Sequence, residues 1–220
     1  MRRIPGYIRA LRTHILNLNK IFSENGFVKT IACSEYVADE LKKEPPGSVV
    51  VVNNFIDQTK FVSKSELRVK NRVLALPRKN IDDIKAVIKL VDGIGYEFVF
   101  ADGLSEADLI NEYHKADIFL ASGYPEGFGL PPLEAMACGA VVVGFTGGGA
   151  NEFMIHKKTS LVATDGDVES VAEYLIQLLN NDELKESIRK QGINISSKYI
   201  EERTAEQLDG FFKTLNKELI

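Results

Sequence analysis

Short apolar runs alternate along this chain with longer segments in which apolar residues recur at every third or fourth position. The short runs predict strands over residues 27–33, 48–52, 73–76, 97–101, 117–121, 140–144 and 160–163. The periodic segments predict helices over residues 35–43, 80–91, 105–114, 130–138, 167–179, 182–198 and 200–219. Unbroken apolar strands between amphipathic helices are typical of a parallel sheet covered on both faces. The expected fold class is therefore α/β, with a doubly wound, Rossmann-like parallel sheet.

Residues suited to helix ends support these boundaries. Ser34 is a plausible N-cap for the first helix, and Ser105 with Asp108 three positions later forms a loose capping box. Gly139 is placed to close the helix that ends at residue 138. Residues 58–71 show no clear period and are interpreted as a linker.

We expect three parts, namely a helical segment over residues 1–26, a Rossmann-like domain over 27–199 and a C-terminal helix over 200–220. The first segment is basic and carries apolar residues on one helical face: Ile8, Leu11, Ile15, Leu18 and Phe22. A helix packed on a protein surface is the favoured interpretation. The alternative is peripheral binding to an anionic membrane, or a transit peptide.

The composition excludes several classes of function. With 27 basic and 31 acidic residues, the formal net charge is −4, so no positive surplus exists to bind a nucleic-acid backbone. Neither Cys33 nor Cys138 lies in a CxxC or CxxH spacing, which predicts buried thiols in a reducing cytosol rather than a zinc or redox site. The three histidines form no metal-binding or catalytic-triad pattern, and no apolar run approaches the ~20 residues that span a bilayer.

The segment 122–139 holds the most informative residues, because it follows a strand at the edge where parallel sheets bind ligands. Gly127 and Gly129 allow a close approach of the backbone to a ligand. Pro131 and Pro132 suit the first turn of the next helix. The amino end of that helix, with free N–H groups and a partial positive charge, then faces the loop, and a diphosphate is its natural ligand.

Two carboxylates, Glu126 and Glu134, frame this segment. A carboxylate can accept hydrogen bonds from a vicinal diol, so one of them suits ribose and the other a sugar. In the alternative interpretation, Glu134 stabilises the helix dipole from the first turn and Glu126 is a solvated loop charge.

Residues 126–139 read EGFGLPPLEAMACG, which closely resembles the E-x7-E signature "EGFGLPxLEAMAxG" of retaining GT-B glycosyltransferases (glycosyltransferase group 1, or family 4). The resemblance continues through ADIFLASGYP before this segment and AVVVGFTGGGANEF after it. It covers about residues 28–179 and is strongest over 126–152. It implies the donor-binding, C-terminal domain of a fold with two Rossmann-like domains.

The resemblance implies roles for individual residues. Glu126 is expected to contact the donor sugar and assist the charge that develops during transfer, and Glu134 to hold the ribose hydroxyls. The remaining donor-binding candidates share loops at the same edge of the sheet: Arg78, Lys79, Gly103, Gly127, Phe128, Gly129 and Leu130.

The two cations correspond to an arginine and a lysine that neutralise the departing diphosphate in the family. Their usual spacing is compressed here to Arg78-Lys79, and the alternative is a basic helix start on the surface. The family places two strands between this lysine and the strand at 117–121, whereas only 97–101 is evident here, so one βα unit is missing. Gly103 stands where the family contacts the base. The cluster 147–149 either lines the ligand site or is a flexible turn.

The expected function is transfer of a hexose from a nucleotide diphosphate sugar with retention of configuration, without a cofactor or metal. The expected partner is an acceptor-binding domain or partner subunit that this chain lacks. A non-catalytic nucleotide-sugar-binding module is the main alternative, and an epimerase or phosphorylase on the same plan is a more distant one.

The expected location is the cytoplasm, with the inner face of the membrane as the alternative, since many relatives build envelope polysaccharides there. The apolar face of the last helix is a candidate homodimer surface, formed by Leu208, Phe211, Phe212 and Leu215.

Overall fold

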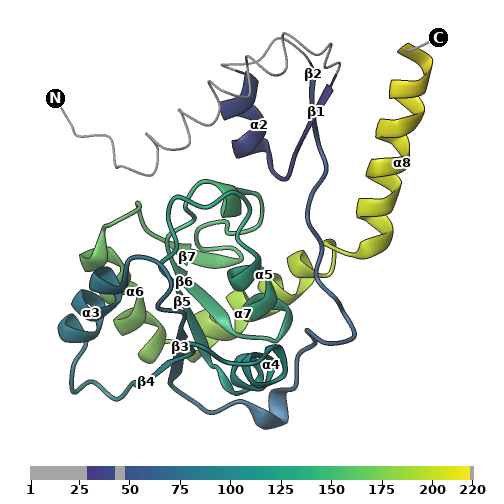
Figure 1. Ribbon diagram of the computed structural model, residues 1–220. Coiled ribbons are helices and arrows are strands. Elements are labelled where there is room, and N and C mark those ends of the chain that lie inside the picture. The colour runs from purple at the N-terminus through teal and green to yellow at the C-terminus, as the bar shows by residue number, and fades with distance from the viewer. Residues whose placement is uncertain (1–28, 43–47, 219–220) are drawn as a thin grey trace, which may run out of the picture. The chain divides into compact units, whose positions relative to one another are not determined.

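The computed structural model describes residues 29–42 and 48–218, which fall into two compact units (Figure 1). The larger unit comprises residues 54–204. The smaller comprises the described residues up to Asn53 together with those from Ala205 onward. The helical segment expected over 1–26 lies outside the described residues.

A parallel five-stranded sheet forms the centre of the larger unit, in the order β4-β3-β5-β6-β7. Its strands are β3 (Arg72–Ala75), β4 (Glu97–Phe100), β5 (Ile118–Ala121), β6 (Val141–Gly144) and β7 (Ser160–Val162). β5 and β6 are buried along their whole length, which is why they read as unbroken apolar runs. The doubly wound α/β fold expected from the sequence is confirmed, and β4 is the one strand between β3 and β5 in the chain.

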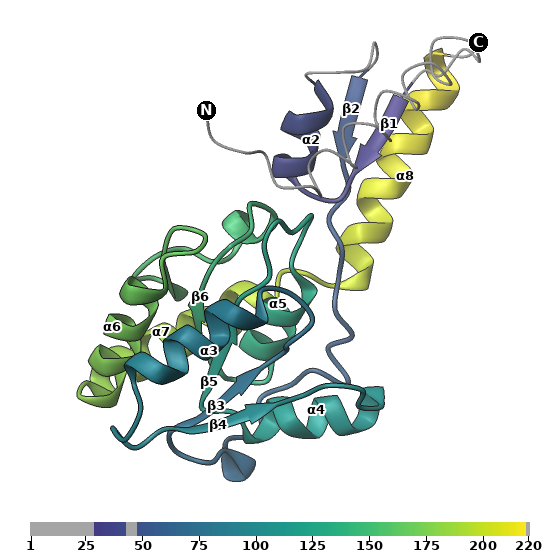
Figure 2. The ribbon, with the colours of Figure 1, turned by 60° about the vertical axis from the view of Figure 1, so that its left-hand side comes forward.

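Helices cover both faces of this sheet. They are α3 (Ile81–Leu90), α4 (Glu106–Lys115), α5 (Leu130–Ala137), α6 (Val168–Leu179) and α7 (Asp182–Ser196), with short 3-10 turns η1 (Ser65–Leu67) and η2 (Gly149–Glu152). α3 and α6 pack together on one face, and α4, α5 and α7 on the other (Figure 2). The capping box is confirmed, because the Ser105 hydroxyl accepts from the Asp108 N–H at 3.2 Å. Gly139 ends α5 in the left-handed region, with φ of 89°.

A buried ionic cluster joins α7 to the amino ends of the strands. The Asp117 carboxylate, just before β5, accepts from Arg189 at 2.6 Å and from Lys185 at 3.2 Å. All three residues are 3% exposed. Burial acts to raise the pKa of Asp117, but the Asn71 N–H and the two cations lower it below its ordinary value.

The smaller unit contains β1 (Lys29–Ala32), α2 (Glu35–Lys42), β2 (Ser48–Val51) and most of α8 (Glu201–Glu218). β1 and β2 pair in parallel with each other and do not join the five-stranded sheet. Asn53 and Gln207 link β2 to α8, because the Asn53 N–H donates to Gln207 at 3.1 Å. The two units divide the chain between residues 53 and 54 and between 204 and 205, while the Rossmann-like domain expected over 27–199 stays a prediction.

The last helix has one buried and one exposed phenylalanine on its apolar side. Phe211 is buried and packs edge-on against Phe212 with ring centroids 5.2 Å apart, while Phe212 is 52% exposed. Within the described part of the chain, no helix is long and apolar enough to cross a membrane.

Candidate functional site

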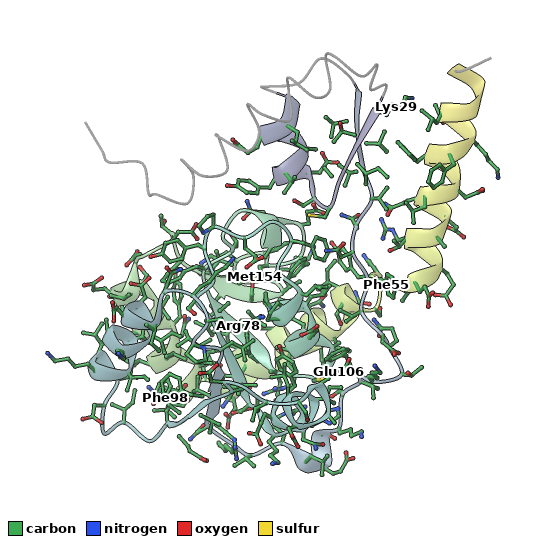
Figure 3. The ribbon with its side chains drawn as sticks, viewed as in Figure 1. Lys29, Phe55, Arg78, Phe98, Glu106 and Met154 are labelled. Carbon is green, nitrogen blue, oxygen red and sulfur yellow. The ribbon has the colours of Figure 1, made fainter. Side chains whose placement is uncertain are left out.

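The loops that follow the strands of the larger unit meet at one edge, because all five strands are parallel. This edge brings together the segments after β3, β5 and β6, which hold most of the residues predicted from the sequence. Figure 3 labels Arg78, which follows β3. The segment 102–105 after β4 lies at the same edge and contains Gly103, exposed and with φ of 65°.

The backbone at Glu126 is hydrogen-bonded to the glycine cluster that follows β6. The Glu126 N–H donates to the Gly147 carbonyl at 2.8 Å, and the Gly149 N–H donates to the Glu126 carbonyl at 3.0 Å. A Cβ at position 147 would lie 2.6 Å from the Gly123 carbonyl oxygen, and one at 149 would collide with the carbonyl of Gly127. The glycines are therefore required for two loops to pack backbone against backbone, and this packing positions Glu126.

Lys79 and Glu126 form an ion pair at this edge. Lys79 Nζ lies 2.8 Å from Glu126 Oε2 and also donates to the Pro125 carbonyl at 2.9 Å. The two side chains are 40% and 33% exposed, so water screens the pair only in part. The cation predicted for a diphosphate and the carboxylate predicted for a sugar are thus in direct contact.

Asn80 links the same two loops, and from its sequence position it was expected only to begin a helix. Its backbone is left-handed, with φ of 51°, a conformation that asparagine adopts more readily than most residues. Its side-chain amide donates to the carbonyls of Ser122 at 2.8 Å and Tyr124 at 3.0 Å instead of capping α3. The Ser122 hydroxyl donates to the Lys79 carbonyl at 3.3 Å. The ion pair therefore rests on a hydrogen-bonded frame.

Tyr124 supports the loop from the side of α3. Its hydroxyl donates to Asp83 at 2.5 Å, and its ring packs edge-on against Phe145 with centroids 5.3 Å apart. Burial and the hydrogen bond to Asp83 raise the pKa of Tyr124 to about 12, so its hydroxyl stays protonated near neutral pH.

Glu134 lies in the second turn of α5, not in the first turn expected from the sequence, because α5 begins at Leu130. The Tyr113 hydroxyl, from α4, donates to Glu134 Oε2 at 3.0 Å. Burial raises the pKa of Glu134, while the Tyr113 hydrogen bond and the charge of Arg78 oppose this shift. Among the described residues, neither Glu134 Oε1 nor the Arg78 side chain has a hydrogen-bond partner, so both remain open to a ligand.

The segment 127–130 presents its backbone to this edge, because the Phe128 side chain is in the core. Phe128 is 3% exposed and packs against Phe153 and Tyr199 with ring centroids 5.7 Å apart in each pair. Gly129 enters α5 in the left-handed region, with φ of 94°. Two of the first three residues of α5 are prolines and lack an N–H. The helix end therefore offers fewer donors to an anion than the sequence argument assumed.

Part of this chain is similar to known glycosyltransferases. Residues 90–195 match the family of glycosyl transferases group 1. An uncharacterized glycosyltransferase of Methanocaldococcus jannaschii is 25% identical over 193 residues, which cover 78% of this chain and 55% of that protein. The chain thus spans little more than half the length of this relative.

Solved structures share the fold. S. aureus TarM, crystallised with UDP, matches with a TM-score of 0.75 and 21% identity over 93% of this chain and 46% of its own. Anabaena HepE, in complex with UDP and glucose, matches with a TM-score of 0.70 and 19% identity over 93% of this chain and 67% of its own.

Proposed function

We propose that this chain is the donor-binding part of a retaining hexosyltransferase, because residues 90–195 match the model of the glycosyl transferases group 1 family. It binds a nucleotide diphosphate sugar and, together with an acceptor-binding domain or subunit, transfers the sugar with retention of configuration. The contact between Lys79 and Glu126 is the observation that carries this proposal. It places a cation beside a carboxylate at the edge where parallel α/β sheets bind ligands.

The charges at this edge suit the charge changes of sugar transfer. As the glycosidic bond to the diphosphate breaks, positive charge develops on the sugar and negative charge on the departing phosphate. Glu126 is proposed to stabilise the sugar, on a backbone fixed by the glycines at 147–149. Lys79 and the exposed Arg78 are proposed to stabilise the diphosphate. Because prolines remove N–H donors from the start of α5, these side chains carry most of that task, and no metal is required.

The two ends of a nucleotide sugar have separate candidate ligands. Glu134 has one carboxylate oxygen open and is proposed to accept hydrogen bonds from the ribose diol. The backbone of residues 127–130 is proposed to contact the sugar and phosphates, and Gly103 the base. The TarM and HepE structures were solved in complex with UDP, which supports a nucleotide as the ligand of this chain.

Calorimetric titration with UDP, GDP, ADP and dTDP sugars tests binding. We expect one nucleotide to bind with a dissociation constant between about 1 µM and 1 mM. Glu134→Ala should abolish this binding, whereas Glu97→Ala, at the opposite edge of the sheet, should leave it unchanged. If none of the donors binds, or if Glu134→Ala binds as well as the wild type, the proposal is wrong.

Slow hydrolysis of the bound donor tests the chemistry. Proton NMR should show that the released sugar first appears with the anomeric configuration of the donor, and Glu126→Gln should reduce its rate at least about a hundredfold. An inverted product would contradict retention. Binding without any sugar release, including after addition of candidate acceptors, would support the non-catalytic binding module instead.

A further inference from the structure

Tyr113 is a buried residue in direct contact with the carboxylate proposed to hold the ribose. It lies near the end of α4, is 0% exposed, and donates its hydroxyl to Glu134 Oε2 at 3.0 Å. Neither the sequence pattern nor the family resemblance assigned it a role.

The position of the Tyr113 hydroxyl is fixed by aromatic packing. The ring packs edge-on against Phe61 with centroids 6.1 Å apart and is tilted against Phe119, on β5, at 5.8 Å. Such pairs restrain the ring in addition to burying it. The hydroxyl therefore reaches Glu134 from a rigid part of the core.

In this pair Tyr113 is the hydrogen-bond donor and the Glu134 carboxylate is the acceptor. Burial and the neighbouring Glu134 charge raise the pKa of Tyr113 well above its ordinary value, so the hydroxyl keeps its proton and acts as a donor. The hydrogen bond occupies Glu134 Oε2 and orients the carboxylate, which leaves Oε1 as the oxygen open to a ligand. A half-buried carboxylate without this donor would be free to rotate and would be more easily protonated.

We propose that Tyr113 is a positioning residue for ribose recognition: it holds Glu134 in the orientation and ionised state in which the carboxylate accepts hydrogen bonds from the ribose diol. This inference rests on the proposed function, because it takes a nucleotide as the ligand. Tyr113 does not contact the nucleotide itself, and it acts through Glu134.

Paired ribose and deoxyribose nucleotides separate this role from a merely structural one. Calorimetry would measure UDP, GDP and ADP, each with its 2′-deoxy counterpart, against the wild-type chain and Tyr113→Phe. We expect the variant to bind the ribonucleotide about three- to tenfold more weakly, and the deoxynucleotide much less affected. The ratio of the two dissociation constants should therefore fall toward one.

Tyr96→Phe is the matched control, because the Tyr96 hydroxyl also makes one partly buried hydrogen bond, to the Leu175 carbonyl at 2.6 Å, at the opposite edge of the sheet. It should leave the ratio unchanged. If Tyr113→Phe weakens both nucleotides equally, or neither, the positioning role is wrong although the proposed function stands. If the wild-type chain binds none of the six nucleotides, the positioning role is wrong, and if it binds no dTDP sugar either, the proposed function falls as well.

Binding as a function of pH supplies a second readout. The charged and titratable groups near the Glu134 carboxylate are Tyr113, Glu106, Arg78 and Cys138. Because a donated hydrogen bond favours the ionised carboxylate, the acid limb of ribonucleotide binding should move to higher pH in Tyr113→Phe. An unmoved limb would contradict the inference.

Discussion

The ion pair between Lys79 and Glu126 should oppose the binding of a nucleoside diphosphate that carries no sugar. If Lys79 is the ligand of the diphosphate, the contact with Glu126 at 2.8 Å must be weakened or lost when the nucleotide binds. Replacing Glu126 by glutamine removes that cost, so the variant should bind the diphosphate more tightly than the wild type does.

The size of this effect follows from the exposure of the pair. Ion pairs at the surface contribute about 0.2–1 kcal/mol, and side chains that are 40% and 33% exposed belong near the upper end of that range. About 1 kcal/mol corresponds to roughly a fivefold change in the dissociation constant. The gain should therefore lie between about twofold and fivefold.

Glu126 also repels the diphosphate directly, so a double-mutant cycle is needed to separate this repulsion from the competition for Lys79. Calorimetry would compare Glu126→Gln in the wild-type chain and in the Lys79→Met variant, where only the repulsion remains. The gain should be larger when Lys79 is present. The intact nucleotide sugar should show no such gain, since the variant also loses its sugar contact.

Equal gains in both backgrounds would show that Lys79 is not shared between Glu126 and the phosphates. Weaker diphosphate binding by Glu126→Gln would contradict the expected competition more directly, because it would mean that Glu126 holds Lys79 in the orientation that binds phosphate.

Three further expectations concern stability, measured by urea denaturation. Gly149→Ala should destabilise the protein by about 1–3 kcal/mol, because the added Cβ would collide with backbone atoms of residues 127 and 128. Gly93→Ala is the control and should cost less, because its Cβ would meet nothing within 4 Å. Equal losses of stability in the two variants would contradict the close packing of the two loops. Asp117→Asn should cost about 3–5 kcal/mol, because it removes the buried carboxylate between Lys185 and Arg189 and leaves each cation only an exposed partner, Asp182 or Glu186. Asp182→Asn, at a side chain 64% exposed, should change stability by less than about 0.5 kcal/mol. His114 is 2% exposed, and burial lowers its pKa below 6.5, so its contribution to the free energy of unfolding is intact above about pH 6.5 and is lost as the pH falls further. His114→Leu should therefore reduce the loss of stability between pH 6.5 and lower pH. An unchanged dependence on pH would contradict this expectation.

The sheet and its helices could be predicted because each element is patterned locally. The wholly buried strands β5 and β6 leave no polar position, and Ser105 and Gly139 mark helix ends by chemistry that acts within a few residues. Features that depend on contacts between distant parts of the chain could not be predicted. The pairing of β1 with β2 apart from the main sheet is one example, since both strands have the same apolar pattern as the others.

Only part of the candidate site could be predicted, because some of its residues are positioned by partners that are distant in sequence. The motif located Glu126 and Glu134, and the start of the helix at residue 130 was predicted correctly, but Glu134 is the fifth residue of α5 and therefore lies in the second turn rather than the first. Tyr113 and Asn80 were missed because their partners are 21 residues or more away in sequence. Asn80 was taken as the first residue of the predicted helix over 80–91, whereas it precedes α3 in the left-handed region, a conformation that an asparagine permits but does not specify.

The backbone hydrogen bonds between Glu126 and the glycine cluster at 147–149 affect how the substrate preference of such a site can change in evolution. Both hydrogen bonds that fix Glu126 come from backbone atoms, and the opposing residues carry no side chains. Under the proposed function, neighbouring side chains can therefore be exchanged, and with them the preferred sugar, while the Glu126 carboxylate keeps its position. Substitutions around the site can then change the substrate while the position of Glu126 is preserved.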